Sequence, residues 1–360
     1  MRYLKQEEKK RCRKLWEEAF PEDSRAFDDY YFAEKLKDNR ILAEEEDGEI
    51  ISMVQLNPYR VRVRDRVYAL SYIVGVATRA DRRHRGHMRR LLLAMLADMR
   101  RERVPFTFLM PAAEAIYLPF DFRFIYDQPH LRWRNDALRA ESAGTDASAI
   151  RELALWQQRE LTGRFEVCTV RDEDYIRNQM EELESEKGEW TLFRGREECL
   201  LGMEGIWGLE KREQRFLYAC PGLTEEEKPA TPAIMARITC LEEFLQSISL
   251  REDAPVERLE VLLTVKDGLI PENDGTFFWT LDREGSAAEA VGAWQGKGSA
   301  EPAVGGQLAS HGTRAAQRPE YETEIGVLTQ WLFGYKMPEQ MPEWGRWIRP
   351  LQGVFLDEVV

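Results

Sequence analysis

The segment that most constrains the fold of this chain is a long apolar run that leads, through an arginine-rich loop, into an amphipathic helix. Residues 67–78 are longer and more continuously apolar than the neighbouring segments, which predicts a buried central strand. Residues 87–103 carry apolar side chains at intervals of three and four, which predicts a helix with one buried face. A strand that feeds directly into a helix packed against it requires a layered α/β structure.

The flanking segments complete this layered unit. Alternating apolar patterns predict three meander strands before the central strand, and two more strands after the helix with a short helix between them. These predicted strands are 40–46, 50–57, 59–63, 104–110 and 122–126. Two helices are predicted at the N-terminus, the second of them capped by Ser24. Residues 1–130 are therefore predicted to form one α/β unit.

The rest of the chain is predicted to form two further units. A polar stretch of small residues at 136–149 marks a connection, and 360 residues are too many for one ordinary domain. We predict a second unit at 131–266, with helices at 149–161 and 172–186, and a third unit at 267–360. The middle of the third unit is rich in Gly, Ala and Ser and is predicted to be loose, whereas its aromatic end is predicted to be packed.

Charge and composition exclude several classes of protein. The formal net charge of −13 argues against a general nucleic-acid binder, which carries a basic face, and favours cationic partners. No apolar run approaches the roughly 20 residues that span a bilayer, and the N-terminus lacks an apolar signal core. The 5 cysteines and 4 histidines show neither CxxC nor metal-ligand spacing. We therefore expect a cytoplasmic protein with reduced thiols, no metal site, and no nucleic-acid or membrane partner.

The loop between the central strand and the helix concentrates positive charge. It places six arginines and two histidines within residues 79–90. Free backbone N–H groups and roughly half a positive charge from the helix dipole suit a pyrophosphate at such a helix start. Arg83 and Arg85 add charged donors, and Gly86 lets a phosphate approach the backbone closely. The alternative is a solvated helix face, although arginines there oppose the dipole unless an anion is present.

The order of residues in this loop resembles a known cofactor loop. It is neither a GxxxxGK[ST] nor a GxGxxG motif. The segment "RHRGHM" at 83–88, after a strand that ends in "VAT" at 76–78, is similar to the acyl-CoA pyrophosphate loop R-x-x-G-x-(A/G) of the GCN5-related N-acetyltransferases (GNAT). Met88 stands where a small residue is usual in that loop.

Motifs along most of the chain resemble one family in particular. The chain is similar to the Eis (enhanced intracellular survival) acetyltransferases in "YIVGVAT", "RHRGHM", "FTFLMPAAEAIY", "LIPENDGTFFW" and the terminal "FLDEVV". The resemblance implies an α/β (α+β) fold of two tandem GNAT-like mixed sheets with helices. A small α+β domain similar to sterol carrier protein is expected to follow them. The resemblance also implies acetyl-CoA as cofactor and a homo-oligomer, either a trimer or a hexamer.

The same resemblance assigns roles to residues of this chain. Family members bind the cofactor through the end of the central strand, the loop-helix and the start of a later short helix. The corresponding residues are Val76, Ala77, Thr78, Arg83, His84, Arg85, Gly86, His87, Met88, Arg89, Ala112 and Ala113. The general acid of the family corresponds to Tyr117, and its base is the free C-terminal carboxylate, which is that of Val360 here.

These roles agree with the chemistry of acetyl transfer, although each residue also has an ordinary structural interpretation. An amine of pKa about 10 needs a base, and burial can raise the pKa of a terminal carboxylate from about 3.5. A tyrosine of pKa about 10 can protonate a departing thiolate of pKa about 8.5. Alternatively, Tyr117 is a core residue and Val360 a frayed end. Asp357 and Glu358 either bind a cationic substrate or are solvated, and the aromatic residues at 27–32 either line the acceptor pocket or pack on the sheet.

The sequence therefore predicts an acetyl-CoA-dependent N-acetyltransferase that acts on a primary amine of a cationic acceptor. Aminoglycoside-like, polyamine-like and lysine acceptors all fit, because a carboxylate-lined pocket attracts ammonium groups. A protein-lysine acetyltransferase and a non-catalytic protein that binds acyl-CoA or lipid are the alternatives.

Overall fold

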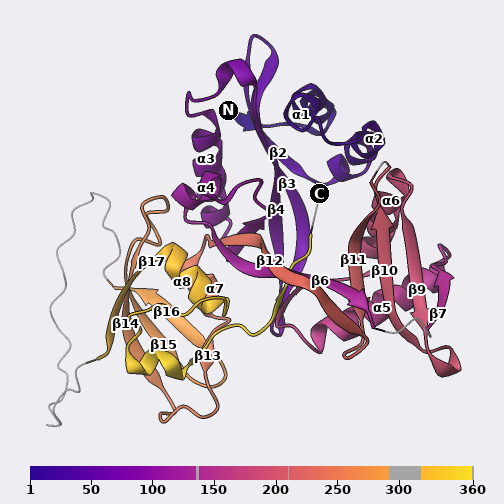
Figure 1. Cartoon of the computed structure of the whole chain (residues 1–360). Coiled ribbons are helices and arrows are strands. Elements are labelled where there is room, and N and C mark those ends of the chain that lie inside the picture. The colour runs from indigo at the N-terminus through magenta and orange to yellow at the C-terminus, as the bar shows by residue number, and fades with distance from the viewer. Residues whose placement is uncertain (135–137, 210, 292–317, 359–360) are drawn as a thin grey trace, which may run out of the picture.

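The computed structural model describes residues 1–134, 138–209, 211–291 and 318–358, which form three layered units (Figure 1). The N-terminal unit surrounds a nine-stranded sheet, and each of the other two units surrounds a four-stranded sheet. The predicted α+β fold, with two tandem sheets followed by a smaller third unit, is therefore confirmed.

The N-terminal sheet has the order β1-β2-β3-β4-β5-β12-β6, and β8 and β19 extend it beside β3. Its strands are β1 (Arg2–Tyr3), β2 (Arg40–Glu46), β3 (Glu49–Val63), β4 (Arg66–Thr78), β5 (Phe106–Leu109), β6 (Arg123–Trp133), β8 (Val167–Thr169), β12 (Thr224–Ile238) and β19 (Val354–Phe355). β3 is one strand where the meander was predicted to contain two. The pairing with β2 stops at Leu56, so the missing N–H of Pro58 interrupts no ladder on that side.

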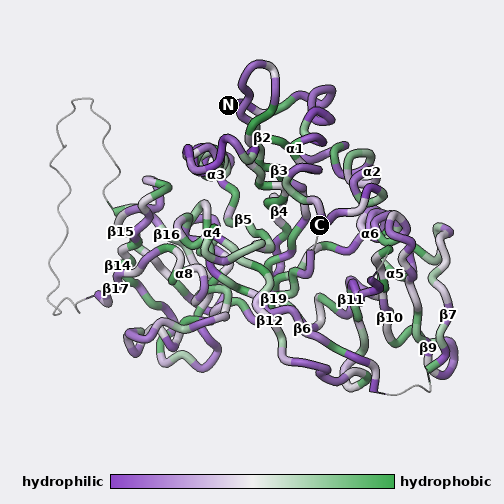
Figure 2. The backbone as a smooth tube through the Cα atoms, turned by 45° about the horizontal axis from the view of Figure 1, so that its top comes forward, coloured by the Kyte–Doolittle hydropathy of each residue, from purple (hydrophilic) through white to green (hydrophobic). Residues whose placement is uncertain are grey.

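Two helical layers cover opposite faces of this sheet. The helices are α1 (Arg13–Ala19), α2 (Arg25–Ala33), α3 (His87–Arg101) and α4 (Glu114–Tyr117), with short turns η1 (Gln6–Cys12), η2 (Lys35–Lys37), η3 (Ala80–Arg82) and η4 (Leu118–Phe120). Leu42 and Ile73 pack under α3, whereas Ala43 and Ala77 pack with α1 and α2. Because successive strand residues face opposite ways, this alternation places the two layers on the two faces. Figure 2 shows hydrophobic residues concentrated along the central strands between them.

The N-terminal aromatic residues pack against the sheet and not into a pocket. Phe27, Tyr30, Tyr31 and Phe32 are all buried in the core with Trp16. The Trp16 ring stacks on Tyr31 at 4.4 Å. The predicted cap is present, since the Ser24 hydroxyl accepts the Phe27 N–H at 3.0 Å. Packing, one of the two interpretations of these aromatics, is therefore what the structure shows.

The second unit is an antiparallel sheet with the order β11-β10-β9-β7. Its elements are β7 (Arg139–Ser142), α5 (Ala147–Thr162), α6 (Glu173–Ser185), β9 (Glu189–Arg194), η5 (Arg196–Glu198), β10 (Leu200–Trp207) and β11 (Glu213–Ala219). The next strand, β12, does not join this sheet but inserts between β5 and β6 of the N-terminal sheet, and Figure 1 shows it beside β6. The N-terminal sheet is thus completed by a strand far beyond the predicted limit of residue 130.

The third unit begins earlier than predicted. Its sheet has the order β16-β15-β14-β17. Its elements are α7 (Leu241–Leu245), β13 (Ser249–Leu250), β14 (Leu259–Lys266), β15 (Gly275–Leu281), β16 (Ser286–Ala290), β17 (Glu320–Glu324), α8 (Ile325–Leu332), η6 (Glu343–Trp347) and β18 (Ile348–Arg349). The predicted boundary between 266 and 267 falls in the turn between two paired strands, because a hairpin pattern does not reveal which sheet it joins. Most of the stretch predicted to be loose, residues 292–317, lies outside the described residues.

All five cysteines carry free thiols, and none of them forms a disulfide. Among the described residues, no group of three or more His, Cys, Asp or Glu side chains is placed to hold a metal ion. The same part of the chain contains no helix with the length and apolar character needed to cross a membrane.

Candidate active site

The loop that precedes α3 presents a row of free backbone donors. Gly86 caps α3 in a left-handed conformation with φ of 78°, which glycine adopts without strain. Within the described residues, the backbone N–H groups of His84 through Arg89 donate to no protein acceptor. The side chain of Met88 packs against the core under α3, so it does not cover them. These donors lie at the positive end of a 15-residue helix and are suited to bind phosphate.

The six arginines of the loop divide into two groups. Three form ion pairs of 2.6–3.0 Å with carboxylates of the loop itself, β2 and β3: Arg79, Arg82 and Arg90. Three form no ion pair within the described residues: Arg83, Arg85 and Arg89. Arg83 donates instead to the Thr78 carbonyl at 3.2 Å. The protein therefore neutralises half of the charge and leaves the other half beside the free N–H groups.

The remaining predicted cofactor residues occupy varied positions. His87 turns its ring toward Glu44 of β2. Burial raises the pKa of Glu44, but hydrogen bonds from Arg90 and His87 outweigh it and hold that pKa below its usual value. Ala112 and Ala113 are exposed at the start of α4. The backbone of Ala112 and Ala113 is therefore open to a ligand. The His87 side chain instead contacts Glu44 and stabilises the packing of α3 on β2.

β4 and β5 separate after a single registered pair. Tyr72 and Phe108 are partners, but β5 ends at Leu109 while β4 continues to Thr78. Between the registered pairs Met53–Ala77 and Gln55–Val74, β4 has one residue more than β3 and forms a bulge, where Gly75 has φ of 57°. Residues 76–78 therefore have no strand partner on the β5 side. The carbonyls of Ala77 and Thr78 accept from Ser52 and Arg83, and the other backbone groups on this side are available to a ligand that lies along the strand, close to the loop described above.

Tyr117 lies at the end of α4 and packs in the core under α3. Its side chain is 8% exposed, and its ring lies 6.0 Å from that of Phe122. Burial raises the pKa of Tyr117 to about 12, so the hydroxyl carries its proton at neutral pH. This hydroxyl makes no hydrogen bond within the described residues. A substrate atom could therefore receive the proton.

The last described residues are buried and not solvated. Asp357 is 5% exposed and Glu358 is 2% exposed. The fully buried guanidinium of Arg171 contacts Asp357 and lies 3.5 Å from Glu358. Thr169 and Tyr175 donate to Glu358 at 2.7 and 2.9 Å. The interpretation of Asp357 and Glu358 as solvated end charges is therefore wrong.

The C-terminal tail and Tyr117 approach the same part of the N-terminal sheet. Both interact with Tyr72 of β4. Burial is the largest cause that raises the pKa of Tyr72, and Coulombic interactions with Glu358 and with the ionisable hydroxyl of Tyr117 raise it further. Val360 lies outside the described residues, so its role as base stays a prediction. The contacts of Glu358 hold the chain in place two positions before Val360. The charge of Glu358 also acts on the pKa of Tyr72.

A cleft beside the tail is lined from several elements. β3 contributes Asn57 and Tyr59, and α6 contributes Tyr175 and Glu182. Glu358 closes one side, and burial raises the pKa of this carboxyl although Arg171 opposes the shift. The remaining lining includes one more carboxylate, that of Asp38, and two cations, Lys35 and Arg215. Three carboxylates and two tyrosines therefore face this cleft. Glu182 pairs with Lys35 at 3.5 Å and with Arg215 at 3.3 Å, so Asp38 is the lining carboxylate that forms no ion pair within the described residues.

Sequence reasoning did not single out several residues of this region. They are Arg171, Tyr72, Tyr175 and Glu182. Arg171 follows the short strand β8, which reaches the site only because it pairs with β3 more than a hundred residues earlier in the chain. Tyr175 and Glu182 have ordinary helical spacing on α6. The one available signal was an arginine in an apolar context after "VCTV", which is too common to indicate a site.

Comparisons with known proteins agree with this architecture. Residues 1–125 match the family model of the acetyltransferase (GNAT) domain, and residues 241–347 match that of the sterol carrier protein domain. Among curated proteins, no relative matches the chain. The second match starts close to the third unit as the structure shows it, and not at residue 267.

Solved structures share the fold along nearly the whole chain. An Enterococcus faecalis protein described as a probable N-acyltransferase superposes with a TM-score of 0.73 at 15% identity, over 98% of this chain and 99% of that one. A GCN5-related N-acetyltransferase from Anabaena variabilis gives 0.68 at 13% identity, over 97% and 94%. Eis1 from Mycobacterium abscessus gives 0.68 at 11% identity, over 99% of both chains.

The two family matches identify the chemistry, and the structural likeness identifies the fold. The N-terminal match places an acetyltransferase domain on the residues that form the loop, the separated strands and Tyr117. The C-terminal match places a sterol carrier protein domain on the third unit. The chain therefore carries an N-terminal acetyltransferase (GNAT) domain and a C-terminal sterol carrier protein domain, and it shares its overall fold with Eis1.

Proposed function

We propose that this enzyme transfers an acetyl group from acetyl-CoA to a primary amine of a small cationic acceptor. The observation that carries the proposal is the row of free N–H groups from His84 to Arg89, beside the unpaired end of β4. This arrangement fits a diphosphate that continues into an extended arm. Tyr117 and the buried tail then lie where such an arm would end.

The chain holds the cofactor mainly through its backbone. The N–H groups at the start of α3 bind the diphosphate, and Arg83 and Arg85 add charged donors. Residues 76–78 hydrogen-bond the arm that runs along β4. Bound acetyl-CoA supplies the activated acetyl group, and the protein supplies orientation and proton transfer.

Two groups of the chain move protons. The Tyr117 hydroxyl, protonated at neutral pH, donates to the departing thiolate. The terminal carboxylate of Val360 accepts the proton of the amine. Arg171 is a positioning residue, because it holds Asp357 and Glu358 and thereby directs the last two residues.

The acceptor binds in the cleft between β3, α6 and the tail. The carboxylates of Asp38, Glu182 and Glu358 line this cleft and attract ammonium groups. Glu182 and Glu358 are buried, so an amine-rich small molecule of the polyamine or aminoglycoside type reaches them more readily than a lysine on a folded protein. A free lysine side chain on a flexible peptide is the third acceptor class within the proposal.

A homo-oligomer and a cytoplasmic location belong to the same proposal. The oligomer, a trimer or hexamer, rests on the resemblance to Eis. The cytoplasmic location rests on five free cysteines without a disulfide framework. Light scattering on the purified chain tests the oligomer, and a monomer would contradict it.

Replacement of Tyr117 by Phe tests the mechanism. Loss of a general acid lowers kcat by about 10²- to 10⁴-fold. The affinity for acetyl-CoA stays the same, because the hydroxyl makes no contact within the described protein that the fold needs. Turnover is measured by thiol release with spermidine, kanamycin and a lysine peptide, and affinity by calorimetry. The matched control is Tyr68→Phe, a tyrosine that bonds Ser247 away from the site.

The outcomes separate an enzyme from a binding protein. If Tyr117→Phe abolishes acetyl-CoA binding, Tyr117 is structural and the mechanism fails. Addition of one alanine after Val360 should remove most turnover and leave acetyl-CoA binding intact. Unchanged turnover in that variant would show that the terminal carboxylate is not the base.

A further inference from the structure

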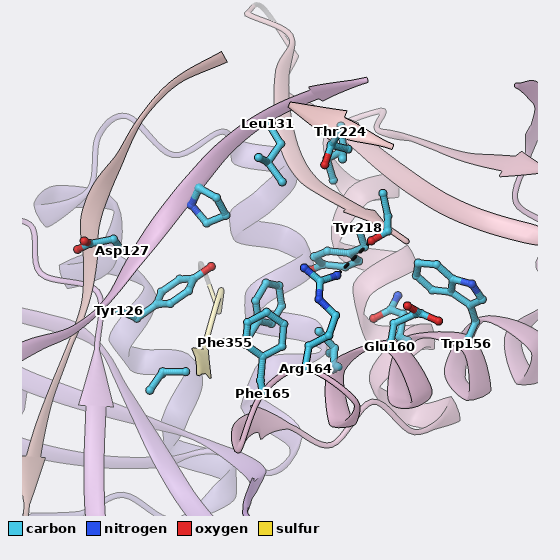
Figure 3. A pocket seen from close by; sticks show the side chains of 16 residues that line it. Tyr126, Asp127, Leu131, Trp156, Glu160, Arg164, Phe165, Tyr218, Thr224 and Phe355 are labelled. Carbon is cyan, nitrogen blue, oxygen red and sulfur yellow. Dashed lines mark hydrogen bonds between the residues drawn. The ribbon is translucent and has the colours of Figure 1, made fainter. Parts of the chain in front are cut away.

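A cavity of about 300 Å³ lies where the second unit meets β6 and the tail (Figure 3). Its walls come from β6, α5, β11 and β19. None of its lining residues lines the cleft beside Glu358 or belongs to the loop before α3. Small-molecule sites have volumes on the order of 300–1,000 Å³. The cavity is therefore large enough for a small ligand and distinct from the candidate active site.

Aromatic rings form most of its wall. Phe165 and Phe355 face each other with ring centres 4.9 Å apart. The polar atoms of two other rings bond to the protein: Trp156 donates to the Leu200 carbonyl at 2.9 Å, and Tyr218 donates to Asp357. One face of the Tyr218 ring stacks on Phe216 at 4.7 Å, and the remaining ring surface of Trp156 and Tyr218 contributes apolar wall to the cavity. Such walls favour a flat, apolar ligand body.

Two charged groups at the cavity have a hydrogen-bond or ion-pair partner on the protein, and a third has no ion pair. The carboxylate of Asp127 accepts the Tyr335 hydroxyl at 2.6 Å, and that of Glu160 pairs with Arg159 at 3.2 Å. Arg164 has no ion pair within the described residues, and its guanidinium donates only to the Ala219 carbonyl at 3.1 Å. Figure 3 shows this guanidinium pointing into the cavity. Arg164 is therefore a cation at this cavity without a carboxylate partner. Guanidinium groups pair best with carboxylates, so an anionic ligand group would fit here.

Tyr126 provides a second, independent indication. Its side chain is 7% exposed, and its hydroxyl is buried with no hydrogen-bond partner within the described residues. In Figure 3 the ring extends from β6 toward Phe355, and Tyr126 lines the cavity. Buried hydroxyl groups nearly always have a partner. An oxygen acceptor on a bound molecule would provide one.

We infer that this cavity is a binding site for a flat aromatic carboxylate. The ring body lies between Phe165, Phe355 and Trp156, the carboxylate pairs with Arg164, and a second oxygen accepts from Tyr126. Phe355 belongs to the same tail as Asp357, so the ligand shares a wall with the segment that Arg171 holds. The inference does not depend on the identity of the acetyl acceptor.

Calorimetry on the full chain with 6-hydroxy-2-naphthoate tests the site. This probe combines a flat ring system with a carboxylate and a second oxygen. We expect saturable binding at one site per chain, at least tenfold weaker for 6-hydroxy-2-naphthamide, which lacks the charge. Arg164→Gln should weaken binding at least tenfold and Tyr126→Phe at least threefold. Arg151→Gln removes a charge from an exposed position of α5, the helix that precedes Arg164, outside the cavity, and should have no effect.

Specific results would overturn the inference. These are no binding at millimolar probe, equal affinity for the acid and the amide, or displacement of the probe by acetyl-CoA. Tighter binding of 2-naphthylmethylamine than of the acid would show that Asp127 and Glu160 govern the cavity and would also overturn it. Circular dichroism of each variant confirms the fold, and since Arg164 is exposed, its replacement leaves the core intact.

Discussion

Replacement of Arg171 by Met tests how the tail is held at the site. Methionine keeps much of the volume of the arginine stem but removes the cation that contacts both Asp357 and Glu358. Breaking a buried ion pair from one side costs about 3–5 kcal/mol, because the opposite charge is left buried. Since about 1.4 kcal/mol is tenfold, the equilibrium between docked and released states shifts by about 10²- to 10⁴-fold.

The tail can release without unfolding the rest of the chain. It follows β19, which pairs only with the short strand β8. Escape of the two carboxylates to water therefore requires loss of the contacts of the last few residues, among them Leu356 of the shared core, and the sheets of the three units persist. We expect kcat to fall by at least 10²-fold, with unchanged acetyl-CoA affinity and a small change in Tm. Hydrogen exchange in residues 350–358 should increase.

The pH dependence of this variant has a definite sign. Burial raises the pKa of Glu358, and Arg171 opposes the shift, so removal of Arg171 raises that pKa further. A carboxyl whose pKa is higher in the docked state binds more protons there. Docking is therefore favoured at low pH and lost as pH rises through the docked pKa. Exchange protection of the tail in Arg171→Met should recover toward pH 5.

A surface arginine provides the matched control. Arg60 pairs with Asp172 at 3.0 Å, but both side chains are about half exposed. Exposed pairs contribute about 0–1 kcal/mol, so Arg60→Met should leave turnover and tail exchange unchanged. Wild-type turnover and wild-type protection of residues 350–358 in Arg171→Met would refute the proposed role of this arginine.

Three further substitutions test the loop, the bulge and a buried carboxyl. Gly86→Glu puts a carboxylate beside the free N–H groups and should weaken acetyl-CoA binding at least tenfold in calorimetry. Gly222→Glu, at φ of 87° in open space, is its control and should not. Gly75→Ala places a Cβ 2.6 Å from the Trp16 ring at positive φ, so the free energy of unfolding in urea should fall by about 2–4 kcal/mol, and an unchanged value would contradict the bulge. Burial raises the pKa of Asp23 to about 6, so this carboxylate destabilises the fold as pH rises from about 4 to 6. Asp23→Asn should be more stable than wild type by about 1–2 kcal/mol at pH 8, discounted for partial exposure, and equal to it at pH 4.

Local patterns in the sequence were sufficient for the central strand, the loop and α3. Residues 87–103 bury the face that their spacing predicts, and Ser24 caps α2 as expected. The same patterns failed at the unit boundaries. The hairpin of β14 and β15 was assigned to two units, because hydrophobic alternation reports a strand but not its neighbours.

In the candidate site, too, the sequence revealed local features but not the contacts between distant segments. Gly86 and the arginines were visible as a loop, but the sequence did not reveal which arginines are neutralised. That depends on carboxylates that β2 and β3 bring beside the loop. Likewise, Asp357 and Glu358 were visible as charges, but only the fold places Arg171 against them.

By itself, the sequence determined the succession of central strand, loop and helix and the gathering of arginines around Gly86 at the helix start, since both arise from neighbours in the chain. The tertiary structure alone decided the insertion of β12 between β5 and β6, the burial of the tail and the cavity at Arg164. Each of these joins segments far apart in the chain. Such contacts form because they bury shared apolar surface and satisfy polar groups, and no local pattern encodes the partner.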